Sequence, residues 1–318
     1  MSNIKEIQEQ IHEDLEISKK SDDTEDHVDT ALYGPLSMVF AHFCIRTGIS
    51  ANAVTVLSLV LGVCGSVFFY PKNLALNLVG IIIEYFSVVL DSADGEVARL
   101  TQTSSQLGRF LDGLVDSLNF LAVYIALGFR MTTELIPFTG RKWGMIIWIV
   151  IIVSGLFHAE QARMADYYRT LHLNFLHRDK NSDFISSDNI KAELAASKDT
   201  PLYNRVYLAV YYLYTSAQES RSPNMRRLIN KMAEQGDALP DDLYETYTAK
   251  SRKYVQLTNV LTFNLRAYTL YLLVLLRLHP FFFPFNIIVL TAIEVYMVVR
   301  YEKIAKETYH DLQRFSGS

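Results

Sequence analysis

The stretch LALNLVGIIIEYFSVVLDSADGEVAR, residues 74–99, places a long apolar run directly against a group of acidic residues. Extended by the residues after it, the run Leu74–Leu90 is long enough as a helix to cross about 30 Å of hydrocarbon, for which roughly 20 mostly apolar residues are needed. The acidic part follows without a break and begins with Asp91 and Asp94. Because carboxylates at membrane depth are costly, the stretch predicts a membrane-spanning helix that carries a functional site.

Five further apolar runs accompany this one, and together they predict an all-α polytopic membrane protein with six transmembrane helices. The six candidate spans are Val54–Tyr70, Leu74–Leu90, Phe110–Phe129, Trp143–Phe157, Val260–Leu278 and Pro284–Val299. Hydrophobic residues make up 50% of the chain and charged residues 20%, a composition that excludes a chain disordered throughout. Several runs are short or carry charges, so we expect them to tilt or to extend beyond the bilayer.

The charge of the chain is divided unevenly along its length. Residues 1–30 contain ten Asp/Glu and three Lys, a net charge of −7. Because the formal net charge of the whole chain is −4, the remaining residues carry +3. This composition predicts an acidic, disordered tail, and it lacks the apolar core of a signal peptide. The overall acidity argues against a nucleic-acid partner, which would require a strongly basic surface.

The segments outside the spans suggest how the chain is organised. We expect residues 31–306 to form one membrane domain, followed by a C-terminal tail over residues 307–318. Apolar residues mixed with basic ones in residues 30–50 favour an N-terminal interfacial helix that lies along the membrane. Residues at about 166–256 form an insertion between the fourth and fifth spans, in which Ser222-Pro223 predicts the start of a capped helix.

The distribution of Lys and Arg predicts the orientation of this membrane domain. With an even number of spans, both termini lie on the same side of the membrane. That side holds Arg46, Arg99, the insertion and the basic residues from Arg300 onward. The bias favours an integral, multi-pass protein whose termini and active site both face the cytoplasm, with the insertion on the same side.

A second acidic segment follows the first. After a gap of eight residues that follows position 99, residues 108–116 read GRFLDGLVD. On a helix, Asp91 and Asp94 share one face, as do Asp112 and Asp116. A helix–turn–helix would bring both faces together, and four carboxylates repel one another unless cations lie between them. Hard oxygen ligands suit Mg²⁺ or Mn²⁺, and four of them suit two ions per active site, an arrangement used in phosphoryl or nucleotidyl displacement.

The complete spacing of this motif resembles the signature of a known enzyme family. It reads Asp91-x2-Asp94-Gly95-x2-Ala98-Arg99-x8-Gly108-x3-Asp112-x3-Asp116. The motif resembles the signature of the CDP-alcohol phosphotransferase family, also called CDP-alcohol phosphatidyltransferases, at every fixed position. The motif covers 26 residues. The six-span pattern extends the resemblance over most of residues 30–306, while the acidic tail and the insertion lie outside it.

The resemblance implies an activity and a set of roles. Enzymes of this family transfer a substituted phosphate group from a CDP-alcohol to an alcohol acceptor, with release of CMP, in phospholipid biosynthesis. Carried over residue by residue, Asp91, Asp94 and Asp112 are metal ligands. Asp116 is the fourth carboxylate of the metal site and the catalytic base that takes the acceptor's proton.

Further residues are implied in substrate binding. The nucleotide-binding candidates are Gly95, Ala98, Arg99, Gly108, Asn52 and Thr55. Family members often carry Pro-Asn-x2-Thr at the start of the first span, and here Ala51 replaces the proline. The candidates for contact with the acceptor or with phosphate are Glu84, Arg109 and Arg266. Arg266 interrupts an apolar run, so it needs an anionic partner; a phosphorylated acceptor, a lipid phosphate or Glu84 would each provide one.

The leading hypothesis is a membrane transferase that uses a CDP-linked lipid, most simply CDP-diacylglycerol, with an inositol or inositol-phosphate acceptor slightly favoured by Arg266. The alternative within the family is an aminoalcohol phosphotransferase that moves a group from CDP-choline or CDP-ethanolamine to diacylglycerol. Two other classes stay open, a membrane prenyltransferase and a divalent-cation transporter. The expected partners are the nucleotide donor, the alcohol acceptor and the lipid bilayer, and a homodimer is possible.

Overall fold

The computed structural model describes residues 23–24, 31–103, 106–177, 186–197, 200–235 and 239–316, with the backbone alone at 106–107, 109–112 and 316. Throughout these residues the elements are helices, and the single β-bridge joins Leu135 to Lys142. The chain divides into two compact units, residues 1–159 with 263–289 and residues 160–262 with 290–318. The predicted acidic tail lies outside the described residues apart from Asp23 and Thr24.

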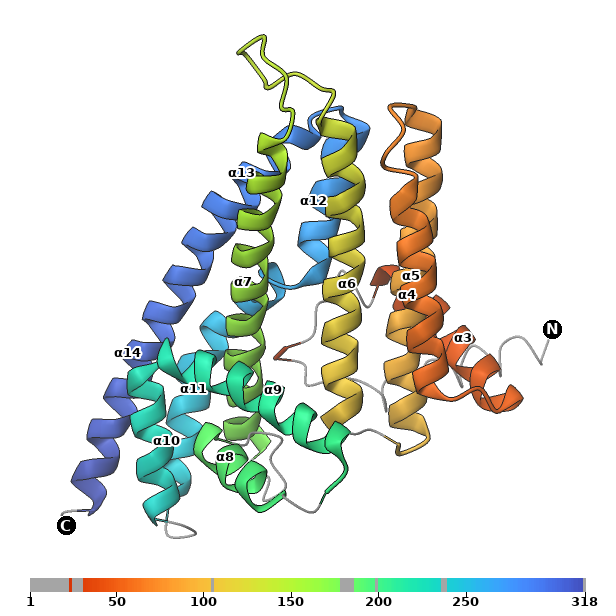
Figure 1. Ribbon diagram of the computed structural model, residues 1–318. Helices are drawn as coiled ribbons and strands as arrows, with labels where there is room; N and C mark the ends of the chain where they lie inside the picture. Colours follow the sequence, from red (N-terminus) through yellow and green to blue (C-terminus); the bar gives the residue numbers. More distant parts are fainter. Residues whose placement is uncertain are drawn as a thin grey trace. The chain divides into compact units, whose positions relative to one another are not determined.

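The first unit contains the helices that carry the acidic motif (Figure 1). Its elements are α3 (Gly34–Thr47), α4 (Ala51–Val67), α5 (Leu74–Leu100), α6 (Gln106–Met131), the part of α7 (Ile146–His177) up to Ala159, α12 (Phe263–Leu275), η3 (His279–Phe281), α13 (Phe282–Pro284) and the π-helical η4 (Phe285–Leu290). Two of these helices begin at a residue whose side chain caps the first turn. The Ser50 hydroxyl accepts a hydrogen bond from the Ala53 amide at 3.4 Å, and the Asn73 Oδ1 atom accepts one from the Ala75 amide at 2.9 Å, as N-cap residues do.

The core of this unit is built from large apolar side chains of α6, α7, α12 and α13. Its buried members include Phe120, Tyr124, Leu127, Ile147, Ile151, Leu270, Val274, Phe282 and Phe283. On the other side of the unit, α4 packs against both α5 and α6. Two glycines make this packing possible, because a Cβ atom at Gly62 would collide with the Asn119 side chain of α6 and one at Gly65 would lie 3.2 Å from the Cγ atom of Glu84. Small residues let helices approach closely.

We expect Gly62→Leu to destabilise the first unit by about 2 kcal/mol or more, because overpacking a tight contact forces neighbouring helices apart. Thermal unfolding of the purified protein in detergent would measure the loss. Gly155→Leu is the matched control, since nothing lies within 4 Å of a Cβ atom built at Gly155. Equal melting temperatures for the two variants would contradict the close contact between α4 and α6.

The membrane-spanning character of the chain is confirmed. Within the described residues, four segments are long and apolar enough to cross a bilayer: Leu74–Leu100, Gly113–Met131, Ile146–His177 and His279–Phe315. The protein is therefore an all-α polytopic membrane protein. The number of six spans stays a prediction, because α4 has 17 residues and α12 only 13. The predicted span Val260–Leu278 is interrupted because α11 ends at Val260 and α12 begins at Phe263.

The helix predicted for residues 30–50 forms as α3, and it packs against α5. Met38 and Ala41 are wholly buried against Leu90, Ala93 and Val97 of α5. Its opposite face is apolar and exposed through Val39 and Phe43. That two-sided character is typical of a helix lying at a membrane surface, and its depth in the membrane stays a prediction.

The second unit contains the insertion, the end of α7 and the last helix. Its further helices are α8 (Ser187–Ala196), α9 (Leu202–Ser220), α10 (Pro223–Gln235), α11 (Asp241–Val260) and α14 (Thr291–Ser316). The helix expected after Ser222-Pro223 is confirmed as α10. Its first amides donate to the Glu302 carboxylate of α14, from Asn224 at 2.8 Å and from Met225 at 3.0 Å. Because α14 continues to Ser316, residues 307–316 of the expected tail are helical.

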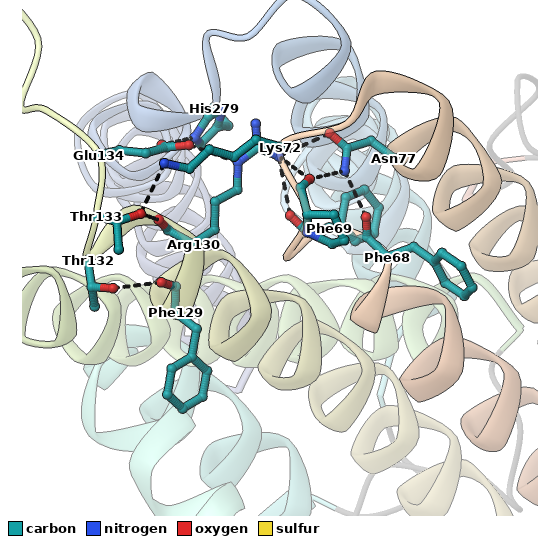
Figure 2. A network of polar contacts seen from close by, with 11 residues as sticks. Phe68, Phe69, Lys72, Asn77, Phe129, Arg130, Thr132, Thr133, Glu134 and His279 are labelled. Carbon is teal, nitrogen blue, oxygen red and sulfur yellow. Dashed lines mark hydrogen bonds and ion pairs between the residues drawn. The ribbon is translucent and has the colours of Figure 1, made fainter.

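A polar network joins the connections at one end of the first unit (Figure 2). The Arg130 guanidinium, 4% exposed, donates to the Glu134 carboxylate at 3.0 Å, to the Asn77 Oδ1 atom at 3.0 Å and to the Phe69 carbonyl at 3.2 Å. Glu134 also binds the His279 Nε2 atom at 2.6 Å. Residues far apart in sequence are thereby held together, from the turn before α5, the end of α6 and the segment after α12.

Candidate active site

The first part of the acidic motif lies on the C-terminal half of α5. Asp91 and Asp94 are one helical turn apart, as the spacing predicts. Asp94 is buried, at 6% exposure, and Asp91 is half-buried. Their surroundings are set by the core that contains Ala93, Val97 and, from the first turn of α4, Val54. The start of α4 therefore packs against the segment of α5 that carries the two aspartates.

The second part of the motif lies on α6, as predicted. Gly108 and Asp116 are half-buried, and Asp112 belongs to the same helix, Gln106–Met131. The side chains of Arg109 and Asp112 lie outside the described residues, so their predicted roles stay predictions. Since α4 packs against both α5 and α6, the two halves of the motif belong to helices that share one neighbour.

Arg99 is placed by a glycine one turn before it. A Cβ atom at Gly95 would lie 3.0 Å from an Nη atom of Arg99, so the guanidinium folds back over the backbone of α5 at this point. The end of this side chain is thus held next to the segment that carries Asp91 and Asp94. A cation fixed at this position can meet the phosphate groups of a nucleotide. Ala98 is half-buried on the same turn.

Asn52 and Thr55 lie in the first turn of α4, close to the aspartate segment through Val54. Asn52 is exposed, and its amide group is therefore accessible. Thr55 is half-buried and donates its hydroxyl to the Ala51 carbonyl at 3.1 Å. The cap of α4 is made by Ser50, so neither residue is needed as the N-cap. Both remain candidates for contact with a nucleotide.

Glu84 and Arg266 are the two buried charged candidates. Glu84 is 1% exposed and packs against Gly65 of α4, and its Oε1 atom accepts no hydrogen bond from the described residues. Arg266 is wholly buried on α12, where Tyr124 and His158 are close enough to interact with its charge. Because α12 packs against α5, both residues belong to the unit that carries the aspartates.

Two polar features near the motif were missed by the sequence analysis. Glu96, at an unconstrained position of the signature, is buried and accepts a hydrogen bond from the Ser37 hydroxyl of α3 at 2.8 Å. Asn119, one turn after Asp116, is buried against Gly62 of α4. A polar residue inside an apolar run was the available signal for Asn119. For Glu96 there was none, because its partner is 59 residues away.

The donor set fits a hard divalent cation. Three described residues of the motif, Asp91, Asp94 and Asp116, offer only carboxylate oxygens, which Mg²⁺ and Mn²⁺ prefer. Among the described side chains, no group of three His, Cys, Asp or Glu is close enough to hold a metal ion. The fourth predicted ligand, Asp112, lies outside that search. The predicted metal site and its two ions therefore stay predictions.

The chain has membrane-spanning helices, and two of them carry acidic residues near one end. These features define a class of membrane-embedded proteins with a polar site at one end of the helices. Residues 49–171 match the profile of the CDP-alcohol phosphatidyltransferase family. The resemblance carried by the acidic motif is thereby confirmed for that part of the chain. The family is named for a phosphatidyltransferase activity, and the expected enzyme class stays a prediction for this chain.

Two relatives are similar to parts of the chain. One is an "Uncharacterized protein" of Aquifex aeolicus, 27% identical over 123 residues, which are 39% of this chain and 59% of that protein. The other is a phosphatidylinositol phosphate synthase of Streptomyces avermitilis, 36% identical over 77 residues, 24% of this chain and 31% of that protein. The chain thus spans between about a third and three fifths of the length of these relatives. No solved structure matches it.

Proposed function

We propose that the protein is an integral-membrane transferase of phospholipid synthesis that moves a phosphatidyl group from a CDP-linked lipid to an alcohol, with release of CMP. The observation that carries this proposal is the acidic motif itself. Its two halves belong to α5 and α6 of one unit, and the first turn of α4, with Asn52 and Thr55, packs against the segment of α5 that carries Asp91 and Asp94. A set of four carboxylates close in sequence to the cation Arg99 suits the binding of a diphosphate together with its metal ions.

The side chains take distinct parts in the proposed reaction. Asp91, Asp94, Asp112 and Asp116 would hold two Mg²⁺ or Mn²⁺ ions, which neutralise the diphosphate and the leaving CMP when bound. Arg99 binds a phosphate oxygen of the donor, and Gly95 leaves the space in which its guanidinium lies. The acceptor hydroxyl attacks the β-phosphorus of the donor, the bond to CMP breaks, and the hydroxyl proton goes to the Asp116 carboxylate.

The acceptor that we propose is inositol or inositol phosphate. The buried cation Arg266, in the same unit as the aspartates, supports an acceptor that carries negative charge. The similarity to a protein named phosphatidylinositol phosphate synthase supports the same choice, although it covers only 77 residues. We further propose that the site and both termini face the cytoplasm, as the Lys/Arg bias predicts.

An acceptor screen tests this proposal. Purified protein with Mg²⁺ or Mn²⁺ and labelled CDP-diacylglycerol would be offered inositol, inositol phosphate, glycerol phosphate, serine, choline and ethanolamine in turn. We expect CMP and a labelled phospholipid with inositol or its phosphate. Formation of product with another alcohol would show that the proposed acceptor is wrong, while the proposed enzyme class would stand. Product only from CDP-choline or CDP-ethanolamine with diacylglycerol would establish the aminoalcohol alternative, and no product from any pair would overturn the proposed activity.

Arg266→Ala should weaken the use of a phosphorylated acceptor more than that of a neutral one. The loss of one charge-assisted contact predicts a KM about tenfold higher or more for the phosphorylated acceptor. Steady-state kinetics with inositol phosphate and inositol would measure the difference. Arg300→Ala serves as the control, because it removes a cation from α14, outside the unit that holds the aspartates. An equal loss with both acceptors would remove the reason for proposing a phosphorylated one.

A further inference from the structure

A cavity of about 500 Å³ lies at the end of the first unit where α5 begins and α6 ends. Three segments line it, the turn with Lys72, the end of α6 with the connection that follows, and the segment after α12. The residues that line it include Lys72, Arg130, Glu134, Phe138, Arg277 and Phe281. Figure 2 shows how Lys72, Arg130, Glu134 and His279 come together at this place.

The cavity is distinct from the acidic motif. Leu74, at the start of α5, and Asp91 are 17 residues apart on one helix, which corresponds to about 25 Å along its axis. The second helix of the motif runs in the opposite direction, and Asp116 precedes its end at Met131 by 15 residues. The cavity therefore lies at the opposite ends of the helices that hold the aspartates, and the proposed reaction does not use it.

The charge of the lining is positive. Arg130 is committed to Glu134 and to backbone carbonyls within the network described above. Lys72 and Arg277 are exposed, and no carboxylate of the described residues pairs with either of them. Within the described part of the chain, the Lys72 Nζ atom donates to the Thr133 hydroxyl alone, at 3.0 Å. Lys72 and Arg277 are therefore available to bind an anion from outside. The carboxylate that lines the cavity, Glu134, is already paired with Arg130.

The rim is also apolar and exposed. Phe138 is 98% exposed at the tip of an ordered hairpin, held by hydrogen bonds from the Ile136 amide to the Arg141 carbonyl at 2.7 Å and from the Trp143 amide to the Glu134 carbonyl at 3.0 Å. Its φ of 65° is unfavourable for a bulky residue. The Phe138 ring approaches that of Phe281, with centroids 6.2 Å apart. An aromatic side chain held out in this way is typical of a group that enters a membrane interface.

We propose that this cavity binds the phosphate-bearing headgroup of an anionic phospholipid. Lys72 and Arg277 contact the phosphate, while Phe138 and Phe281 lie among the first carbons of the acyl chains. The position favours a lipid, because the candidate spans Leu74–Leu100 and Gly113–Met131 begin and end at the cavity, where a membrane surface must lie. Cations beside exposed apolar groups are the combination that an anionic lipid satisfies and a soluble anion does not.

Tryptophan fluorescence provides the test, since the chain has two tryptophans and both lie near this end. In a Trp148→Phe background, Trp143 of the hairpin is the single reporter. The protein would be placed in phosphatidylcholine bilayers that contain increasing amounts of brominated phosphatidylglycerol or, in a second series, brominated phosphatidylcholine. We expect the anionic lipid to quench Trp143 at a much lower mole fraction than the neutral lipid.

The variant Lys72→Gln/Arg277→Gln should reduce the preference for the anionic lipid by about 30-fold, roughly fivefold for each charge removed. Arg141→Gln/Lys142→Gln is the matched control, because it removes two exposed cations of the same hairpin that do not line the cavity. Thermal unfolding of both variants would establish that they fold. An unchanged preference in the first variant, or equal loss in both, would overturn the site. If inorganic phosphate at millimolar concentration competed with the lipid, the proposal of a lipid ligand would be wrong and a soluble anion would be the ligand.

Discussion

Asp116→Asn is expected to lower the rate of CMP release by about a thousandfold or more while the protein still binds the nucleotide donor. A positioned general base contributes about 10²–10⁴ to the rate, and this carboxylate is also a proposed metal ligand. Asparagine keeps the size of the side chain but cannot take the acceptor's proton. CMP release under single-turnover conditions and equilibrium binding of CDP-diacylglycerol would measure the two properties separately.

The control for this substitution is Asp188→Asn, which makes the same chemical change at an exposed residue of the second unit that pairs with Arg226 at 3.1 Å. It should leave CMP release unchanged. If Asp116→Asn released CMP at the wild-type rate, the catalytic assignment would be wrong. If the variant lost its melting transition as well, Asp116→Glu would distinguish a role in folding from one in catalysis, because it keeps a carboxylate.

Arg130→Met should have the largest effect on stability, a loss of about 3–5 kcal/mol in the free energy of unfolding. Removing one partner of a buried ion pair leaves the other charge uncompensated. Here the loss includes the bond to Glu134 and those to the Phe69 carbonyl and to Asn77. Thermal or denaturant unfolding in detergent would measure it. Arg141→Met, at an exposed position of the following hairpin, should cost little, and equal losses would contradict the network.

The same network predicts a dependence of stability on pH. Burial alone would raise the pKa of Glu134, but hydrogen bonds from His279 and Arg130 outweigh burial and hold the pKa of this carboxyl below its usual range. The contribution of Glu134 is therefore fully present above the pKa of an unfolded glutamate, about 4.3, and is lost as the pH falls through the lower folded value. Unfolding measured between pH 7 and pH 3 should show a decline at the acidic end that Glu134→Gln lacks.

Much of the site could be predicted from local sequence. The runs before Asp91 and around Asp116 form helices because apolar residues dominate them, and the spacing of Asp91 and Asp94 follows from the period of a helix. Pro223 begins α10 as the local sequence predicts, while the first amides of the helix donate to Glu302 of α14. The family match over residues 49–171 confirms the motif. The individual metal and substrate roles stay predictions, and for Asp112 and Arg109 the side chains lie outside the described residues.

What could not be predicted depends on pairs distant in sequence. The bond between Glu134 and His279 joins residues 145 positions apart, and hydropathy contains no information about such partners. The start of the predicted fifth span was misplaced for a different reason. Hydropathy treats residues 260–278 as one apolar run, but the backbone ends one helix at Val260 and begins another at Phe263. The close approach of Gly62 to Asn119 likewise depends on which helices are neighbours.

The hydrogen bond from Ser37 to Glu96 has a consequence for protein engineering. The acidic motif is an obvious part to transplant into another membrane scaffold, and the matched region begins only at residue 49. A chimaera cut there would lose α3, and with it both the Ser37 hydroxyl that donates to Glu96 and the helix that packs against this part of α5. The smallest transferable piece of this chain therefore starts upstream of the family's own boundary, with α3 included.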